Sequence, residues 1–483
     1  MPGPRVRFAP SPTGFFHVGS ARTALFNWFV ARQSPDGVFV LRIEDTDESR
    51  NREEWVDGIV AAMEWLGMHA DVGPYRQSDH ASEHFGAVEL LRAAGYIYMC
   101  DCTPDMVMAR KADDKTPGYD GFCRERGLAP GPGAAYRFKV PREGTTLVSD
   151  AVRGEVTFQN EHIEDFVVAK SSGAVLFALS NVVDDRRDEI THVIRGEEHL
   201  PNTPKQILMW RALDEVTSDV VAVPTFAHLP VLVNEQRKKL SKRRDPVAVE
   251  MYRDQGYLPE AFANYLSLLG WSPRGTEEKV AIDLCVEQFK LSDVSHSPAF
   301  FDVKKLAHLN GEYIRELPLS EFIERCAPWV RPWSTSWAPA DRQPDWSAQQ
   351  FDESAFEQMA PLVQERVATF GEVAEMVDFI FLDAAPVDDA AFAKSIGADP
   401  LSRDVLVSAV SRFTEASWDV ETLHAVTVEL GEQLGLNLRK TQAPIRCAVT
   451  GRNVGPPLFE SLVVLGRDQT IVRLRAALAR SQR

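Results

Sequence analysis

Two distant stretches of the chain carry side chains suited to handling a phosphate group. The first, APSPTGFFHVGS, places His17 two residues before Gly19, where an apolar strand-like run gives way to a helical pattern. An imidazole can donate a hydrogen bond to a phosphate oxygen, and glycine lets a ligand approach the backbone closely. The second, KKLSKRR, places Lys239 and Lys242 around Ser241. Two ammonium groups suit a phosphoryl group whose negative charge grows in the transition state.

Either stretch alone has an ordinary explanation, since a lone histidine often caps a helix and a lysine-rich run is often solvated surface. No GxxxxGK[ST] or GxGxxG pattern is present, so the sequence does not predict a Walker loop or a dinucleotide fingerprint. The combination of the two stretches is far more specific. It predicts that they converge on one phosphate-bearing ligand.

The surrounding sequence indicates elements that could bring these stretches together. Apolar runs alternate with helical patterns over residues 5–98 and again over 186–238, as in βαβ units on a parallel sheet. Turns and antiparallel-looking strands interrupt this rhythm over 99–185, which we interpret as an insertion. Beyond Lys239 the pattern is almost entirely helical, and a Pro- and Trp-rich segment at 326–346 is interpreted as a linker or boundary. We therefore predict a doubly wound, Rossmann-like α/β domain with an inserted α+β domain and an all-α C-terminal region.

Composition narrows the class of protein further. The 483 residues carry a formal net charge of -17, yet residues 434–483 hold nine Lys or Arg against two Asp or Glu, a local charge of +7. A local positive face of this kind could guide a polyanion to an otherwise acidic protein. No stretch approaches the ~20 apolar residues that would span a bilayer. With six sparse cysteines as well, we expect a soluble protein of the reducing cytoplasm with no membrane partner.

At this point a family resemblance becomes specific. APSPTGFFHVGS resembles the HIGH signature of class I aminoacyl-tRNA synthetases in the form used by glutamyl-tRNA synthetases, and KLSKR resembles their KMSKS loop. Further matching segments follow in order over about residues 1–320: LRIEDTD, NVVDD, THVIRGEEHLPNTPKQ, YLSLLGWSP and FDVKKLAHLNGEYI. The helical remainder resembles the bacterial type of anticodon-binding region.

This resemblance implies an activity and a domain plan. It implies ATP- and Mg²⁺-dependent ligation of L-glutamate to the terminal adenosine of glutamate tRNA through glutamyl-adenylate. It implies a catalytic domain at 1–98 and 186–238, an inserted acceptor-stem-binding domain at 99–185, a stem-contact helical domain at 239–325 carrying the KLSKR loop, and an anticodon-binding region at 326–483 with a subdomain boundary near 382. We expect a monomer.

The resemblance also assigns roles to individual residues. Glutamate carries two carboxylates and one ammonium, so its pocket needs at least two guanidinium groups and one acid. The implied glutamate-binding residues are Arg7, Ala9, Ser11, Glu44, Phe177, Asn181 and Arg195. The implied ATP-binding residues are Pro10, Thr13, His17, Gly19, Glu198, Leu229, Lys239 and Lys242, of which His17, Gly19, Lys239 and Lys242 are the catalytic set.

Several positions depart from the family pattern. Phe177, in AVLF, stands where the family usually has a tyrosine whose hydroxyl helps to hold glutamate. Loss of one hydrogen bond to a charged ligand costs about 1.5–3 kcal/mol unless another group replaces it. His199 stands where some members place an adenine-stacking Trp, and His308 replaces a common Trp.

A cysteine pattern at the start of the insertion predicts a metal site. Cys100 and Cys102, followed by Tyr119 and Cys123, resemble the structural zinc site of some glutamyl synthetases. Zinc favours a closed tetrahedron of thiolate and N or O ligands, which would order a small insertion. Tyr119 is the predicted fourth ligand and Glu125 the alternative; a degenerate site that holds no metal is the other interpretation.

Recognition of the tRNA leaves alternatives open. Arg366, in QERVATF, matches the arginine by which discriminating members reject the glutamine anticodon, although a lone helical arginine is often only a surface ion pair. We favour charging of glutamate tRNA alone. A non-discriminating enzyme that also charges glutamine tRNA, and an inactive paralogue that binds tRNA as a regulatory module, are the alternatives.

Overall fold

The computed structural model describes residues 3–46, 50–111, 118–217, 219–241, 245–275 and 278–482. The chain folds into two compact units, one formed by residues 1–251 and 262–302 and the other by 252–261 and 303–483. This division is coarser than the four-part plan drawn from the sequence, whose finer boundaries stay a prediction. Within the described residues, no helix is long and apolar enough to cross a membrane.

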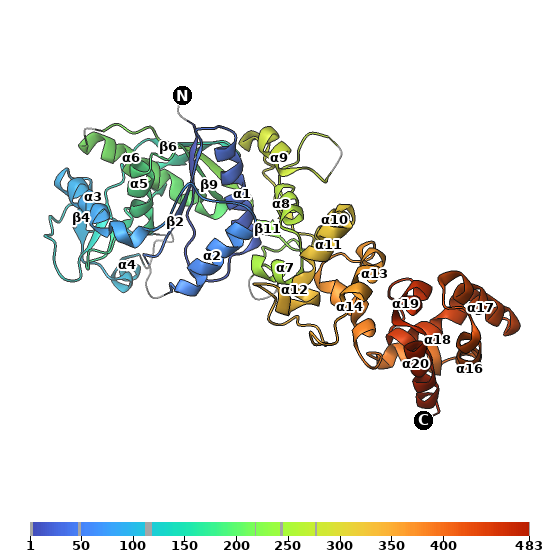
Figure 1. The fold of residues 1–483 in the computed structure, drawn as a ribbon. Coiled ribbons are helices and arrows are strands. Elements are labelled where there is room, and N and C mark those ends of the chain that lie inside the picture. Colours follow the sequence, from blue (N-terminus) through green and yellow to red (C-terminus); the bar gives the residue numbers. More distant parts are fainter. Residues whose placement is uncertain are drawn as a thin grey trace. The chain divides into compact units, whose positions relative to one another are not determined.

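A seven-stranded sheet forms the centre of the first unit (Figure 1). Its strand order is β3 (Val72–Arg76), β2 (Val38–Ile43), β1 (Arg5–Phe8), β9 (His192–Gly196), β10 (Thr225–Leu229), β6 (Thr145–Asp150) and β7 (Gly154–Gln159). All pairs are parallel except β6 with β7. Strand β2 is buried over nearly its whole length, as a strand covered on both faces must be. The predicted α/β fold class is confirmed.

Helices connect and cover these strands. They are α1 (Val18–Arg32), α2 (Glu53–Trp65), α3 (Ala81–Ala93), α5 (Phe177–Arg187) and α6 (Thr203–Val216), with the short helices η1 (Gln77–His80) and η3 (Glu197–Asn202). Helix α1 packs against β1, β2 and β9, and α6 packs against β6. Because β1 and β9 are adjacent parallel strands, their carboxyl ends meet at one edge of the sheet. That edge also receives the start of α1.

The insertion does not form one separate sheet. Strands β4 (Ile97–Cys100), β5 (Ala135–Phe138) and β8 (Val167–Ala169) build a three-stranded antiparallel sheet, accompanied by α4 (Pro104–Arg110) and η2 (Asn160–His162). The hairpin of β6 and β7 instead extends the large sheet through pairing of Asp150 with Phe226. Strands within 145–159 thus pair with the large sheet, and the expected bounds 99–185 of the inserted domain stay a prediction.

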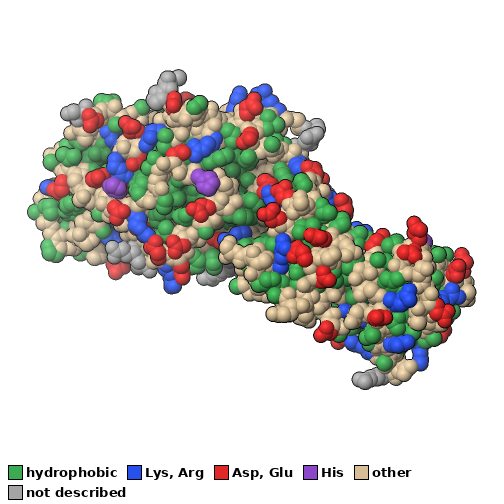
Figure 2. Space-filling view, viewed as in Figure 1, with side chains coloured by type: hydrophobic (Ala, Val, Ile, Leu, Met, Phe, Trp, Pro, Cys, Tyr) green, Lys and Arg blue, Asp and Glu red, His purple; other side chains and the backbone are tan. Residues whose placement is uncertain are grey.

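A small two-stranded sheet spans the KLSKR stretch, because β11 (Leu232–Val233) lies before it and β12 (Ala299–Phe300) after it. The helices that follow the stretch are α7 (Val249–Gln255), α8 (Pro259–Ser267), α9 (Ile282–Gln288) and η4 (Leu291–Asp293). On the face shown in Figure 2, acidic and basic side chains are interspersed with apolar ones. The visible part of the surface thus mixes both signs of charge, although the whole chain is acidic.

The second unit is helical and has two apolar cores. The first core involves α10 (Val303–Glu316), α11 (Leu319–Arg325), α12 (Ala327–Val330), α13 (Glu353–Gln364) and α14 (Gly371–Phe381). The second involves α15 (Asp389–Phe392), the π-helix η6 (Ala393–Gly397), α16 (Pro400–Glu415), α17 (Val420–Gln433), α18 (Leu438–Thr450), α19 (Leu458–Leu465) and α20 (Arg467–Arg480).

The interpretation of 326–346 as a linker is wrong. Trp329 and Trp346 are both buried in the first helical core, and the indole N–H of Trp346 donates to the Val330 carbonyl at 3.0 Å. The prolines fit because they open short elements: α12 has proline in its first turn, and η5 (Pro332–Ser334) begins with one. Burial of large aromatic rings, which the composition does not reveal, makes this segment part of the core.

Candidate active site

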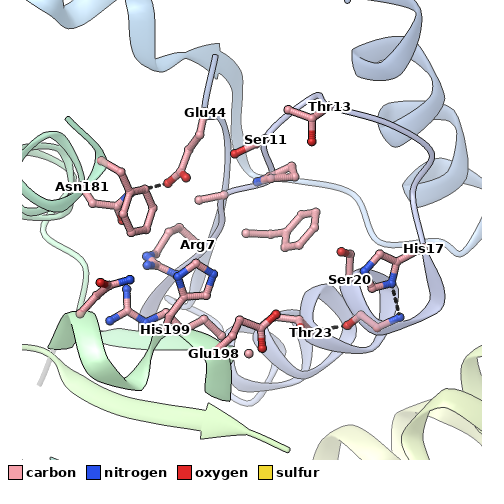
Figure 3. A pocket seen from close by; sticks show the side chains of 18 of the residues that line it. Arg7, Ser11, Thr13, His17, Ser20, Thr23, Glu44, Asn181, Glu198 and His199 are labelled. Carbon is pink, nitrogen blue, oxygen red and sulfur yellow. Dashed lines mark hydrogen bonds between the residues drawn. The ribbon is translucent and has the colours of Figure 1, made fainter. Parts of the chain in front are cut away.

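One cavity in the first unit, about 640 Å³ in volume, gathers the residues singled out from the sequence (Figure 3). It lies at the edge of the sheet where β1 and β9 end and α1 begins. The described site residues that line it are Arg7, Ala9, Pro10, Ser11, Thr13, His17, Gly19, Glu44, Phe177, Asn181, Arg195, Glu198, Leu229 and Lys239. Lys242 lies outside the described residues. The two predicted stretches therefore converge on one cavity.

His17 is the N-cap of α1, and its own cap fixes its tautomer. Its Nδ1 accepts a hydrogen bond from the Gly19 backbone N–H at 2.9 Å, so Nδ1 is unprotonated. A neutral ring must then carry its proton on Nε2, which makes Nε2 the donor nitrogen of the ring. A Cβ on residue 19 would lie 2.7 Å from the His17 ring, so glycine is needed for this arrangement.

Backbone pairing ties the His17 turn to the chain just beyond the lysine-rich stretch. Val18 N–H donates to the Val247 carbonyl at 2.8 Å, and Val249 N–H donates to the Phe16 carbonyl at 2.9 Å. The Asp245 carboxylate accepts from the Ser241 backbone N–H at 2.8 Å, which fixes the described end of the KLSKR stretch. The two distant stretches are thus mechanically connected.

Lys239 reaches the cavity from a short hairpin in which Leu240 N–H donates to the Leu232 carbonyl. Its ammonium lies 3.8 Å from the Glu198 carboxylate, and both side chains are more than half exposed. An exposed pair of this kind contributes little, about 0–1 kcal/mol. A phosphate entering the cavity could therefore displace Glu198 from Lys239 at small cost.

The amino-acid side of the cavity has a buried arginine on β1. Arg7 is 4 % exposed, and its Nε donates to both oxygens of Asp185 at 3.1 and 3.3 Å. Its two Nη groups make no hydrogen bond with any residue that the structure describes. They remain available to an anion in the cavity.

Glu44 and Asn181 form a buried acid and amide pair beside Arg7. The Asn181 amide nitrogen donates to Glu44 Oε1 at 2.5 Å. Burial raises the pKa of the Glu44 carboxyl, although the charge of Arg42 and the hydrogen bond from Asn181 oppose this shift. An ammonium group bound here would favour the ionised carboxylate.

Arg195, on β9, is a buried guanidinium that has no carboxylate partner within the described chain. Its Nη2 donates to Thr203 Oγ1 at 2.8 Å and to Gln206 Oε1 at 2.7 Å, and its Nε donates to His228 Nε2 at 3.2 Å. Burial and, to a lesser extent, the charge of Arg7 lower the pKa of Arg195 to about 9. A buried cation without an anion is costly, so the arrangement favours an anionic ligand.

Arg42 is a functional residue that the sequence reasoning missed. It is fully buried; its Nη2 donates to Asn181 Oδ1 at 3.1 Å, and its Nη1 lies 2.8 Å from Asp185. Arg42 thereby fixes the Asn181 amide so that its nitrogen faces Glu44, and it shares with Arg7 the carboxylate of Asp185. The available signal was an arginine inside the otherwise apolar run VFVLRI.

Arg22, on α1, was also missed although it lines the cavity. Its side chain is buried and donates to the carbonyls of Pro230 and Leu269. Burial lowers its pKa to about 10, opposed by the charges of Glu198 and Glu197. Arg22 connects α1 to the chain on either side of the KLSKR stretch, and its helical position gave no sequence signal.

The three cysteines of the insertion come together. The ligand atoms of Cys100, Cys102 and Cys123 all lie within 4.8 Å of one another, and the first and last are buried. The Tyr119 hydroxyl oxygen accepts from Cys100 Sγ–H at 3.4 Å and from Cys123 N–H at 2.7 Å. Three cysteine sulfurs at these spacings are compatible with a zinc site, and the Tyr119 phenol oxygen lies beside one of them.

Glu125, the alternative fourth ligand, faces elsewhere. Its carboxylate pairs with the Lys139 ammonium at 3.0 Å, and 78 % of its side chain is exposed. Arg110 and Arg126 instead donate to the sulfurs of Cys102 and Cys123 at 3.3 and 3.1 Å. These guanidiniums can offset the negative charge of thiolate ligands. The geometry favours Tyr119 over Glu125.

In the second unit, Arg366 is exposed just beyond the end of α13, and its Nη1 donates to the Leu362 carbonyl at 3.1 Å. A second arginine lies nearby: burial and the charge of Arg366 both lower the pKa of Arg446 on α18. Arg446 was part of the basic C-terminal stretch but was not singled out. The pair presents two guanidiniums that favour an anion or a base edge.

Comparison with known proteins agrees with this site. The family model described as tRNA synthetases class I (E and Q), catalytic domain, matches residues 4–308, and the anticodon binding domain model matches 321–478. The fold and the cavity are those of a class I tRNA synthetase, and the chain belongs to this family.

Within this family, the chain is similar over nearly its whole length to several individual proteins. The chain is 54% identical over 478 residues to the glutamate–tRNA ligase of Frankia casuarinae, covering 99% of this chain and 98% of the relative. It is 51% identical to that of Thermobifida fusca, covering 98% and 97%. A solved glutamate tRNA ligase from Elizabethkingia meningosepticum, in complex with its amino acid, is similar with a TM-score of 0.79 and 27% identity, covering 99% of both chains.

Proposed function

We propose that this protein is a glutamate–tRNA ligase, which joins L-glutamate to the 3′ terminal adenosine of glutamate tRNA at the expense of ATP. The observation that carries this conclusion is the single cavity that receives Arg7, Glu44 and Arg195 together with His17 and Lys239. Such a cavity offers two cations and an acid to a dicarboxylic amino acid beside donors for phosphate oxygens. The full-length relatives at 51–54% identity carry the same name.

Amino-acid binding follows from the charges on the cavity wall. The ammonium of glutamate pairs with Glu44, whose carboxylate is oriented by Asn181. The two carboxylates pair with the unfilled amino groups of Arg7 and Arg195. Ala9, Ser11 and Phe177 complete the wall. Because these groups are buried, their interactions with charge are stronger than they would be in water.

The first chemical step is attack by the α-carboxylate oxygen of glutamate on the α-phosphorus of ATP. The new bond forms between that oxygen and phosphorus, and the bond to the β-phosphate oxygen breaks, so pyrophosphate leaves with its electron pair. His17 Nε2–H and the Lys239 ammonium donate to the phosphate oxygens as their charge grows. Mg²⁺, which accompanies ATP in this class, supplies further neutralisation of phosphate charge. We assign Lys242 to the same task.

In the second step the terminal 2′-hydroxyl of the tRNA attacks the activated carbonyl. An ester forms, the bond from the carbonyl carbon to the AMP oxygen breaks, and AMP leaves while the hydroxyl proton passes to a phosphate oxygen of the departing AMP. No covalent bond to the protein is required. Catalysis then rests on positioning and on fixed charge. Pro10, Thr13, Gly19, Glu198 and Leu229 line the nucleotide side.

We assign zinc to Cys100, Cys102 and Cys123, with Tyr119 as fourth ligand. Zinc there would tie the start of the insertion to the loop before β5. Metal analysis of protein purified without chelator is expected to give one zinc per chain. A content near zero would contradict this assignment, and Tyr119→Phe is expected to weaken zinc retention more than Glu125→Gln.

The remaining parts of the plan are also proposals. Residues 99–185 contact the acceptor stem, 239–325 the adjoining stem, and 326–483 the anticodon, with Arg366 rejecting glutamine tRNA. We expect a cytoplasmic monomer. Size-exclusion chromatography with light scattering tests the monomer, and a mass of twice 53.9 kDa would contradict it.

Aminoacylation with each purified tRNA tests the proposed function. We expect glutamate to be joined to glutamate tRNA and not to glutamine tRNA, and Arg366→Gln to permit both. Equal charging of both tRNAs by the natural protein would favour the non-discriminating alternative. Absence of tRNA-dependent ATP turnover would favour the inactive paralogue.

A further inference from the structure

His199 carries a buried polar atom that nothing in the described chain satisfies. Its Nδ1 is enclosed and has no hydrogen-bond partner. Its ring packs on Phe177, with ring centroids 5.5 Å apart and planes inclined by 37°. Both side chains line the cavity, and Figure 3 places the His199 ring beside Arg7. An enclosed polar atom without a partner is rare in folded proteins and calls for a ligand or a water.

The surroundings of His199 hold its ring neutral. Burial, together with the charges of Arg195 and Arg7, lowers its pKa to about 4, and the charge of Glu198 opposes this shift. A neutral imidazole has one donor nitrogen and one acceptor nitrogen. His199 can therefore present a donor to the cavity without adding a third positive charge.

The neighbouring side chains restrict which kind of ligand atom can form a hydrogen bond with His199 Nδ1. Arg7 uses only its Nε on Asp185, and Arg195 leaves Nη1 without a hydrogen bond to any described residue. These amino groups, all donors, favour an acceptor as their common partner. A cation is disfavoured there by two guanidiniums. A carboxylate, which only accepts hydrogen bonds, meets the needs of all three side chains.

We propose that His199 is a glutamate-binding residue, whose Nδ1–H donates to a carboxylate oxygen that Arg7 or Arg195 also holds. This inference rests on the proposed function, because it takes glutamate as the occupant of the cavity. Phe177 fixes the plane of the imidazole by packing on its face, and η3 fixes the backbone of residue 199. The side chain thus supplies a hydrogen bond that the Phe177 ring cannot.

Three substitutions separate the role of Nδ1 from the role of the ring. His199→Phe keeps an aromatic ring on Phe177 and removes both nitrogens. His199→Asn places an amide nitrogen near the position of Nδ1, and His199→Gln places it nearer Nε2. Apparent KM values for glutamate, ATP and tRNA are measured in aminoacylation, with thermal melts to verify folding.

We expect His199→Phe and His199→Gln to raise the KM for glutamate about 10- to 100-fold, the loss expected for one hydrogen bond to a charged group. His199→Asn is expected to stay within about threefold of the natural protein, since it restores the donor. The KM for ATP should change less than about threefold in all of them.

An unchanged glutamate KM in His199→Phe would overturn the proposal, as would an increase confined to ATP, which would assign the ring to the adenine. If His199→Phe fails to fold, equal glutamate KM values in the Asn and Gln variants would overturn it. The outcomes remain distinct from failure of the proposed function. If the proposed function is wrong, the natural protein will not charge glutamate tRNA. If only the role of His199 is wrong, the natural protein will still charge it.

Discussion

The two sides of the cavity are built in opposite ways. On the amino-acid side, Arg7, Arg42 and Glu44 are each less than 10 % exposed and are joined by hydrogen bonds and ion pairs. On the phosphate side, Lys239 and Glu198 are more than half exposed and approach each other only to 3.8 Å. One side is a closed network and the other is open to water.

This contrast fits what each side has to recognise. A small dicarboxylic amino acid is selected by fixed geometry, and burial keeps charged groups in one arrangement with little screening. A phosphate chain carries more charge and must enter and leave, so exposed cations that exchange partners suit it. Variants of the buried groups that are joined by ion pairs should therefore lower both stability and glutamate affinity, and variants of exposed groups should lower only the rate.

Arg42→Met should have the largest effect. It leaves the carboxylates of Asp184, Asp185 and Glu44 without their shared cation, and breaking a buried ion pair costs about 3–5 kcal/mol of unfolding free energy. The KM for glutamate should rise as well, because Asn181 loses its anchor. Denaturant unfolding measures the first effect and aminoacylation the second.

The matched control is Arg32→Met. Its ion pair with Asp71 is partly exposed, so its removal should cost no more than about 1 kcal/mol. Equal losses of stability in the two variants would remove the distinction between buried and exposed charge on which the contrast rests.

Lys239→Met should lower kcat about 10²-fold, as loss of one group aimed at developing charge typically does. The KM for glutamate and the unfolding midpoint should change little, because the side chain is exposed. Lys238→Met, one residue away and not lining the cavity, serves as control and should stay within about twofold of the natural rate. A large rise in the glutamate KM of Lys239→Met would show that Lys239 also takes part in glutamate binding. That result would contradict the division of the cavity into an amino-acid side and a phosphate side.

Gly19→Ala should lower kcat about 10-fold or more by moving His17, since the new Cβ would lie 2.7 Å from the ring. In Gly86→Ala, on α3, the added methyl meets nothing within 4 Å and should leave the rate unchanged. Pyrophosphate exchange in the presence of tRNA provides the measurement. A normal rate in Gly19→Ala would count against a role for the His17 ring.

The smallest effect concerns pH and stability. The pKa of His199 is about 4 in the folded protein, below its ordinary 6.5. As pH falls through 6.5 the unfolded chain gains a proton that the folded chain does not, so stability decreases down to about pH 4. His199→Phe should therefore lose less stability between pH 6.5 and 4.5 than the natural protein. Parallel curves would show that burial and the charges of Arg195 and Arg7 do not hold the ring neutral against the opposing charge of Glu198.

The sequence predicted which residues converge better than it predicted how they are held. His17, Arg7 and Arg195 stand at strand ends or helix starts, and in a parallel sheet such positions meet at one edge. The ion pairs of Arg42 could not be foreseen, because they depend on how α5 lies against β1 and β2. Glu125 likewise faces away from the cysteines because it pairs with Lys139, which lies 14 residues away in the sequence.

Two features of the fold organisation could not be predicted from the sequence, for related reasons. The hairpin at 145–159 has the local pattern of any antiparallel pair, and its attachment to β10 is a long-range event. The segment 326–346 is rich in proline, which indicates turns, while the burial of Trp329 and Trp346 is decided by helices far along the chain. Local composition predicts turns well. It does not predict whether helices from distant parts of the sequence bury the residues of those turns.

Arg195→Met offers the most direct test, because Arg195 is buried with no carboxylate paired to it among the described residues and so has its largest role when an anion is bound. Aminoacylation and thermal unfolding without glutamate are measured on the same preparation. We predict a fall in kcat/KM for glutamate of about 10²- to 10³-fold, with no loss of unfolding midpoint. A glutamate KM within threefold of the natural value, or destabilisation as large as that of Arg42→Met, would contradict the assignment of this cavity to a dicarboxylic substrate.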